Sequence, residues 1–463
     1  SSDWSSDVCS SDLCTRPRQD AAGRVVQQER GVAEEFCFHA ERGQAYAFDR
    51  VCAVCHSEAD DAPADRAQQQ VAAVAAGQLH AVLGAHVAAW DGTWADGDFA
   101  FDGDDRLLQG VRWDMFSLHQ LGHTHSPAWS VSATGLHGQG YFGHVFWDTE
   151  IYMLPYYILT APETARDLLQ YRYDRLDAAR AVAREHGFEG AKFPWTSTRD
   201  GRDVCPPDWE RCGKRQIHIS ADIAYAFHRY CAWTGDQQFF DRCTVEVLVE
   251  TARFFRSRMT EGDDGRLHLL DVIGPDEYNI HADDNYYTNY LARWNLLTAV
   301  EAMADLRDRD RDRHAELGRR LDWTAAEADQ LAAAAERLAF PRVRDGVWEQ
   351  YDGFFELKDV GEIERDENNM PVEQLHAYDQ GYQILKQADA VMVPLLFPAA
   401  MPEEEQRQTF EYYEKRNTFA SSLSASTSCV VGLRLGLQEH AYNYFKLAAR
   451  LDLDNLHFDQ NTN

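Results

Sequence analysis

Residues 271–289 combine acidic, aromatic and amide side chains around a break in the backbone pattern. The stretch reads DVIGPDEYNIHADDNYYTN, so a Gly-Pro pair comes directly before Asp276 and Glu277. Because proline disrupts the interior of a helix, Pro275 predicts a turn here. Flat rings suit the C–H faces of a sugar, and carboxylates and amides suit its hydroxyl groups. The segment therefore predicts that a rigid turn presents the carboxyl group of Glu277 to a site of sugar chemistry.

Three further clusters carry the same mixture of side chains: GYFGHVFWDTE at 140–150, FPWTS at 193–197 and ILKQAD at 384–389. In them Trp147 lies beside Asp148, and Lys386 lies beside Gln387 in what the apolar pattern predicts to be a helix. Each residue also has a structural explanation: Trp147 as core, Asp148 as a helix cap, and Lys386 as a side chain that snorkels from a packed helix. Glu277 could likewise be a charge at the start of a helix. If all of these residues were structural, four clusters with the same mixture of side chains would have arisen independently. One sugar site explains them together.

Composition excludes several classes of protein. The 463 residues are 44% hydrophobic and 12% aromatic, which is typical of a large globular protein. A formal net charge of −31 repels phosphate backbones, so we expect no nucleic-acid partner. Apolar runs stay well short of the roughly 20 residues that a membrane span needs, so we expect no membrane partner. The ten cysteines are scattered and do not resemble a disulfide framework, which favours a reduced, cytoplasmic setting.

Two motifs raise the alternative of a metalloprotein. VCAVCH, residues 51–56, matches the C-x-x-C-H pattern of covalent haem attachment, but the segment is short and β-prone, and we predict a strand. A metal site would use three histidines, His119, His123 and His125. HQLGH has the i, i+4 spacing of a zinc protease, but Gln120 stands where the catalytic glutamate would be. We therefore predict no metal site and no cofactor.

The first 125 residues divide into three parts. Residues 1–13 repeat Ser-Ser-Asp three times without targeting logic; they resemble a translated sequencing adaptor, and we interpret them as non-native sequence. Residues 14–61 contain extended segments and look like the remnant of a β-domain. Residues 62–125 read as two helices, the first alanine-rich and the second with an apolar face from Leu107 to Leu118, which we interpret as a helical linker.

From residue 126 onward the sequence predicts helices joined by short loops. In TGD, Gly235 can take the left-handed position after one helix and Asp236 can cap the next. Gly436 ends another helix in the same way. Repeated helical hairpins without intervening strands predict a mainly α fold, either an open solenoid or a closed toroid, and long aromatic loops favour the toroid.

At this point the sequence resembles glycoside hydrolase family 65, the inverting phosphorylases of maltose, trehalose, kojibiose and nigerose. The resemblance runs from about residue 35 onward. Five strings carry it: GLHGQGYFGHVFWDTEIYMLPYY, QIHISADIAYA, VIGPDEYNIHADDNYYTNYLARWNL, LKQADAVMVPLLFP and SSLSASTSCVVGLRLG. It implies an (α/α)6 catalytic barrel over 126–463, preceded by the remnant of an N-terminal β-sandwich domain at 14–61 and the linker at 62–125. It also implies a homodimer in the full-length protein.

The resemblance also assigns roles. Glu277 matches the general acid of a GPDE motif. The residues that match those holding the transferred glucosyl unit are Trp147, Asp148, Lys386 and Gln387. Ser421 and Ser422 match a serine pair in the phosphate pocket, although Phe419 stands where many members have a histidine. The family's last barrel helices would lie beyond Asn463, so we expect the chain as given to be a poorly active fragment with an open barrel edge.

These roles predict an inverting α-glucoside phosphorylase. It would cleave an α-linked glucose disaccharide with inorganic phosphate to β-glucose 1-phosphate and glucose. One carboxylic acid suffices because phosphate is itself an anionic nucleophile, and Lys415 and Arg416 could help to bind it. The alternative is an inverting α-glucosidase or trehalase on the same fold, which needs a second carboxylate roughly 6.5–9.5 Å away; Glu414 is the candidate. A non-catalytic sugar-binding protein would not need Glu277.

Overall fold

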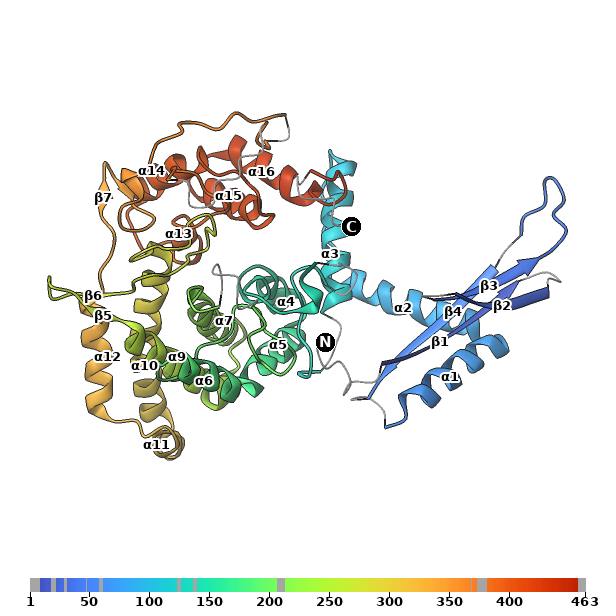
Figure 1. Cartoon of the computed structure of the whole chain (residues 1–463), viewed down its shortest axis with the longest axis horizontal. Helices are drawn as coiled ribbons and strands as arrows, with labels where there is room; N and C mark the ends of the chain where they lie inside the picture. Colours follow the sequence, from blue (N-terminus) through green and yellow to red (C-terminus); the bar gives the residue numbers. More distant parts are fainter. Residues whose placement is uncertain are drawn as a thin grey trace. The chain divides into compact units, whose positions relative to one another are not determined.

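The computed structural model describes residues 9–17, 22–28, 31–46, 48–57, 61–122, 126–135, 140–205, 213–367, 369–372 and 381–456. The chain divides into two compact units, one that ends at Asp98 and one that begins at Phe99 (Figure 1). The boundary falls inside the segment that the sequence predicts as a helical linker, residues 62–125. Each unit is described by itself.

The first unit pairs its strands in two antiparallel ribbons. Strand β1 (Cys9–Pro17) pairs with β4 (Phe48–His56), and β2 (Ala22–Gln28) pairs with β3 (Gly31–Cys37). Helix α1 (Pro63–Ala73) packs on β1 and β4, and it continues through η1 (Val74–Gln78) into α2 (Leu79–Gly97). The predictions of extended structure before residue 61 and of a strand for VCAVCH are confirmed. Residues 9–13, part of the segment that we interpret as non-native sequence, form the first part of β1.

The second unit is mostly helical. Its first helices are α3 (Asp105–Leu121), η2 (Gly140–Gly143), η3 (Thr149–Met153), α4 (Leu154–Thr160), α5 (Pro162–Asp174), α6 (Leu176–Glu185), α7 (His218–Thr234), α8 (Gln237–Phe239), η4 (Phe240–Thr244) and α9 (Val245–Arg258). The later ones are α10 (Tyr286–Arg309), α11 (Arg311–Arg320), α12 (Ala325–Arg337), η5 (Phe354–Glu356), α13 (Met392–Leu396), α14 (Glu403–Glu414), α15 (Leu423–Arg434) and α16 (Gln438–Arg450). Two short hairpins interrupt them: β5 (Thr260–Glu261) with β6 (Leu267–His268), and β7 (Val343–Arg344) with β8 (Val347–Trp348).

Helices of the second unit pack mainly against helices that lie close to them in the sequence. Helix α10 packs against α7, α9 and α12, and α15 packs against α16. The predicted turn after α7 is confirmed, because Gly235 has a φ of 72° and the Asp236 side chain accepts a hydrogen bond from Phe239 N at 2.9 Å. Helix α16 returns to α3 (Figure 1), and there a Cβ on Gly110 would lie 2.1 Å from the carbonyl oxygen of Ala449. Only glycine allows that close approach.

Cysteine chemistry differs along the described chain. Six described cysteines are free thiols: Cys37, Cys52, Cys55, Cys231, Cys243 and Cys429. Cys205, by contrast, is disulfide-bonded. The expectation that the cysteines lack disulfides therefore holds for these six and is wrong for Cys205. Among the described helices, none combines the length and the apolar composition that crossing a membrane requires.

Candidate active site

The segment between β6 and α10 forms the predicted turn. Residues 271–285 are irregular, and Glu277 lies in a turn directly after the bend at Pro275. The segment is closed by an antiparallel bridge, in which Val272 N donates to Ala282 O at 2.8 Å and Ala282 N donates back at 2.9 Å. Glu277 therefore sits in a pinned loop, as the sequence predicts.

Gly274 allows this turn to approach its support. A Cβ at this position would lie 2.4 Å from both Asn285 Nδ2 and Asp389 Oδ2. Both groups are buried and bonded, because Asn285 Nδ2 donates to Asp389 Oδ1 at 3.0 Å and the Asn285 side chain caps α10 by accepting from Thr288 N at 2.9 Å. The glycine of GPDE is thus required by packing at the base of the turn.

Asp276 is the anchor of the turn. Its carboxylate is 1% exposed and accepts four hydrogen bonds, from Lys386 N at 2.8 Å, Tyr278 N at 3.2 Å, Gln350 Nε2 at 3.0 Å and Asn279 Nδ2 at 3.1 Å. Burial raises the pKa of Asp276 to about 6, although these donors favour its charged form. Through Lys386 N, one buried side chain connects the turn that carries Glu277 to the segment that carries the lysine.

Glu277 pairs with a cation and an amide. Its Oε2 lies 2.5 Å from Lys386 Nζ, and its Oε1 accepts a hydrogen bond from Gln216 Nε2 at 3.1 Å. The side chains of Glu277 and Lys386 are 24% and 22% exposed, so the ion pair faces an accessible space. Both carboxylate oxygens accept from donors, which is the arrangement of an ionised carboxyl group.

Lys386 and Gln387 do not lie in a helix, and that prediction is wrong. Their segment is irregular and precedes α13. Its backbone bonds distant partners instead, since Lys386 N donates to Asp276 and Leu385 O accepts from Thr418 N at 2.8 Å. The Gln387 side chain is 4% exposed and donates to the carbonyl oxygen of Pro275. In this structure Gln387 therefore braces the turn.

Asp148 lies in the electrostatic field of the Glu277–Lys386 pair. The pKa of Asp148 is raised from 3.8 to about 6, mainly by burial and also by the negative charges of Glu277 and Glu150, while Lys386 lowers it. Asp148 precedes η3 without making a side-chain cap, so the helix-cap explanation receives no support. The structure thus brings together three of the predicted site residues: Asp148, Glu277 and Lys386.

Trp147 forms a buried wall behind Asp148. It is 1% exposed, and its ring lies 4.8 Å from the ring of His218, 6.1 Å from Tyr287 and 6.4 Å from Trp195, between ring centroids. These edge and tilted contacts are typical of aromatic packing. The core explanation therefore describes Trp147 in this structure, and Trp195 of FPWTS belongs to the same cluster.

The serine pair precedes α15. Ser421 is half-buried and Ser422 is exposed. Two residues further on, the buried Ser424 Oγ accepts a hydrogen bond from Ala388 N at 3.0 Å, which ties this helix start to the segment of Lys386. Phe419, at the position where many members have a histidine, has a φ of 50°, is 2% exposed and stacks on Tyr444.

Charged residues near the serine pair are already engaged or exposed. Arg416 pairs with Asp359 at 2.8 Å, and Lys415 is exposed. Glu414, the candidate base for hydrolysis, accepts a hydrogen bond from the hydroxyl group of Tyr444. The structure therefore does not favour Glu414 as a free base.

Two sets of polar contacts were not predicted from the sequence: the contact of Gln216 with Glu277, and the contacts around Asp222. Gln216 contacts Glu277 across 61 residues of sequence, and His218 Nδ1 lies 2.7 Å from Asp222 Oδ2, with both side chains fully buried. Tyr287 donates to the other oxygen of Asp222 at 2.7 Å. A signal was present, because QIHISAD places amide, imidazole and carboxyl groups at the start of an otherwise apolar helix.

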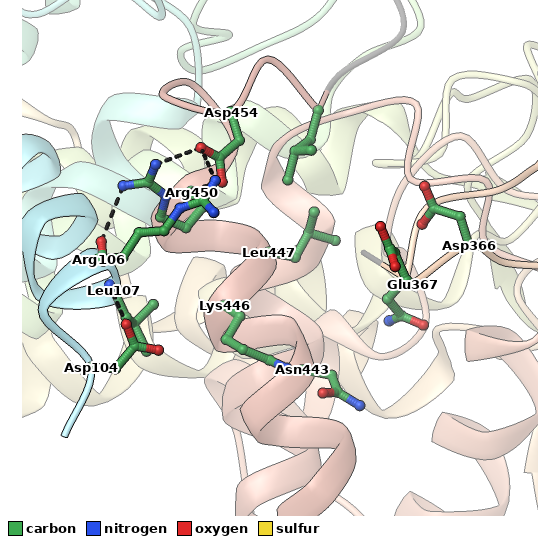
Figure 2. A pocket seen from close by; sticks show the side chains of 12 residues that line it. Asp104, Arg106, Leu107, Asp366, Glu367, Asn443, Lys446, Leu447, Arg450 and Asp454 are labelled. Atoms are coloured by element: carbon green, nitrogen blue, oxygen red, sulfur yellow. Dashed lines mark hydrogen bonds and ion pairs between the residues drawn. The ribbon is translucent and has the colours of Figure 1, made fainter.

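The pocket in Figure 2 is separate from this site. It has a volume of about 240 Å³ and lies where α3 meets α16. Its side chains include Arg106 and Arg450, which both pair with Asp454, at 2.9 and 2.5 Å. None of the predicted sugar-site residues lines it, so we assign it to the closure of α16 on α3.

The described residues contain no group of three or more His, Cys, Asp or Glu side chains that could hold a metal ion. His119 instead lies 2.8 Å from the hydroxyl oxygen of Tyr156. His123 and His125 lie outside the described residues.

The buried carboxyl group of Asp389 should make the free energy of unfolding depend on pH. Burial, together with the charge of Asp276, raises its pKa from 3.8 to about 8. Between these two values the folded state holds a proton that the unfolded state has lost, so stability falls as pH rises, by up to about 1.4 kcal/mol per pH unit from this group. Asp389→Asn removes this titration, so its stability relative to the wild type increases from pH 5 to pH 8.

Urea unfolding at pH 5, 6.5 and 8 measures this difference, with the exposed Asp308→Asn as the matched control. Stabilities of Asp389→Asn and the wild type that run parallel across this range would contradict the assignment.

Comparison with known proteins matches most of the chain to a single protein family. The model of the "Glycosyl hydrolase family 65 central catalytic domain" matches residues 112–462, and that of the family's N-terminal domain matches residues 6–93. A kojibiose phosphorylase from Caldanaerobacter subterraneus subsp. tengcongensis is 38% identical over 382 residues, which cover 80% of this chain and 50% of that protein. An alpha,alpha-trehalose phosphorylase from Geobacillus stearothermophilus is 38% identical over 377 residues, which cover 79% of this chain and 48% of that protein.

A solved structure is also similar. It is described as a putative kojibiose phosphorylase from human microbiome, with a TM-score of 0.81 and 26% identity, and the likeness covers 96% of this chain and 60% of that chain. The chain thus spans about half the length of the curated relatives it matches. Because the catalytic-domain model covers most of the chain, the chain belongs to glycosyl hydrolase family 65.

Proposed function

We propose that the protein is an inverting α-glucoside phosphorylase that converts an α-linked glucose disaccharide and phosphate to β-glucose 1-phosphate and glucose. The observation that carries this proposal is the Glu277–Lys386 pair at 2.5 Å, held on two pinned loops within the field of Asp148. Similar proteins are named kojibiose and alpha,alpha-trehalose phosphorylases. The hydrolase alternative is less favoured, because its candidate base, Glu414, is engaged by Tyr444.

In this proposal each group has one task. Glu277 donates its proton to the glycosidic oxygen while a phosphate oxygen attacks the anomeric carbon from the opposite face. The carbon–oxygen bond to the leaving glucose breaks as the bond to phosphate forms. Asp148 and Lys386 bind hydroxyl groups of the transferred glucosyl unit, with Gln387 and Trp147 supporting them. Ser421 and Ser422 donate to phosphate, which is the co-substrate; the reaction as proposed uses no other cofactor.

The architecture and setting belong to the same proposal. We infer an (α/α)6 barrel over residues 126–463, supported by the packing of α10 against α7 and α9. Free thiols at six described cysteines support a cytoplasmic setting, while the disulfide at Cys205 argues against it. Homodimer formation by the full-length protein stays a prediction.

The test is a disaccharide assay with and without inorganic phosphate. Kojibiose, trehalose, nigerose and maltose are each incubated with the protein, and β-glucose 1-phosphate and glucose are quantified. We expect cleavage to require phosphate and to release the two products in equal amounts. Replacing both Ser421 and Ser422 by alanine should raise KM for phosphate about tenfold or more, through loss of anion donors, and leave KM for the disaccharide nearly unchanged. Equal cleavage without phosphate would contradict the proposal.

A further inference from the structure

The two oxygens of Glu277 have partners of different kinds. Oε1 accepts from the amide of Gln216 at 3.1 Å, and Oε2 pairs with the ammonium group of Lys386 at 2.5 Å. Gln216 is completely buried, and the backbone before it is tied to the same turn, because Ile273 N donates to Arg215 O at 3.1 Å. The Lys386 side chain is longer and 22% exposed. Gln216 is therefore the fixed partner and Lys386 the exchangeable one.

These partners also differ in which protonation state of Glu277 they accept. An ammonium group has three donors and no acceptor, so a proton on Oε2 and the ion pair with Lys386 exclude each other at that oxygen. An amide N–H, by contrast, can donate to a carboxylate oxygen or to the carbonyl oxygen of a neutral acid. Gln216 can thus hold Oε1 in both protonation states, whereas Lys386 matches only the ionised state.

We propose that Gln216 is the positioning residue of the general acid. It holds Oε1 while Lys386 leaves Oε2 for a hydroxyl group of the bound sugar, and Oε2 then takes a proton from solvent and faces the glycosidic oxygen. In the reaction the Oε2–H bond breaks, the proton joins the leaving glucose, and monohydrogen phosphate releases an equivalent proton as it is glycosylated. Lys386 can then return to the carboxylate. This role rests on the proposed function only in that Glu277 acts as an acid.

The second amide atom of Gln216 is enclosed by the protein as well. This atom, Oε1, is buried and has no hydrogen-bond partner among the described residues. Buried acceptors without a partner are rare and unfavourable. The hydrogen bond to Glu277 Oε1 therefore ties a fully enclosed amide group to the acid.

Gln216→Met tests the positioning role, because it keeps the length of the side chain and removes its donor. We expect kcat for the disaccharide to fall about 10- to 100-fold, within the contribution of general-acid catalysis, and KM to change less than about twofold. With α-glucosyl fluoride, whose leaving group departs with little help from an acid, the fall should be less than about threefold.

Gln406→Met is the matched control, since this buried glutamine on α14 donates to Pro398 O and Met401 O, which precede the helix. The kcat of Gln406→Met should stay near that of the wild type, both with the disaccharide and with α-glucosyl fluoride. Equal losses with disaccharide and fluoride in Gln216→Met, or a change confined to KM, would overturn the proposal. Wild-type cleavage with water in place of phosphate would contradict the proposed function and leave this comparison valid.

Gln216→Glu separates positioning from packing if the methionine variant is unstable. Among the described residues, Lys386 pairs with Glu277 and Asp148 interacts with it electrostatically, and the variant adds a carboxyl group beside Oε1. Two carboxyl groups at this distance repel when both are ionised and share a hydrogen bond when one is protonated. We expect the loss of kcat relative to wild type to be at least about tenfold greater at pH 8 than at pH 5.5. A loss of kcat that is the same at both pH values would mean that Gln216 only fills space.

Discussion

Glu277→Gln should abolish turnover of α-glucoside disaccharides while glucose binding stays within about threefold of the wild type. The amide keeps the shape of the side chain and one acceptor oxygen, but it carries no proton that it can donate to a leaving oxygen. General-acid catalysis contributes about 10² to 10⁴ in rate, and the loss should lie in that range or above it. Because the Lys386 ion pair is also lost, the ammonium group becomes more available to sugar hydroxyls, which favours retained binding.

The measurement is kcat and KM for the disaccharide with phosphate, together with glucose binding by calorimetry. Glu261→Gln is a suitable control, because Glu261 pairs with Arg337 on the surface and has a side chain 65% exposed. With α-glucosyl fluoride, Glu277→Gln should recover much of its activity. A variant that keeps more than about half of the wild-type rate on the disaccharide would remove Glu277 from the mechanism.

The features that could be predicted from the sequence are local ones. Pro275 excludes a helix by its own chemistry, so the turn at Glu277 follows from the sequence and is confirmed. The helix stop at Gly235 and the cap at Asp236 depend on residues within one turn of each other, and both are confirmed. The resemblance to family 65 rests on long ordered strings, and the family models confirm it.

The features that could not be predicted depend on contacts between distant segments. Lys386 lies in an apolar run that reads as a helix, but its N–H is taken by Asp276, 110 residues earlier. Gln216 has no local feature that assigns it to Glu277, and only folding brings the two side chains to 3.1 Å. Trp147 beside Asp148 suggests an exposed ring against a sugar, whereas tertiary packing places the ring in a buried aromatic wall. In each case a long-range partner overrides the local pattern.

The support beneath Glu277 leads to the second large expected effect, for Asp276→Asn. Four N–H donors converge on the Asp276 carboxylate, two on each oxygen. An asparagine must turn its NH2 group toward one pair of these donors in either orientation of the amide. Two buried donors then lose their acceptor and face another donor, at about 1–3 kcal/mol each. We expect the free energy of unfolding to fall by about 2–6 kcal/mol.

The loss of kcat in Asp276→Asn should exceed the loss that partial unfolding alone would cause. Asp276 holds both Lys386 N and the backbone of the Glu277 turn, so losing two of its four hydrogen bonds weakens the support that the acid and its lysine share. Misplacement of a catalytic group by about 1 Å can cost about 10² in rate, and we expect at least that loss in kcat at temperatures where the variant is folded.

Asp389→Asn is the matched control. It makes the same substitution in the same buried network, at a carboxyl group whose pKa of about 8 keeps it protonated at pH 7. Its losses of stability and kcat at pH 7 should both be much smaller. If the two variants were equally impaired, a general sensitivity of the buried network to asparagine would explain the result, and Asp276 would have no special role in holding Glu277 and Lys386 together.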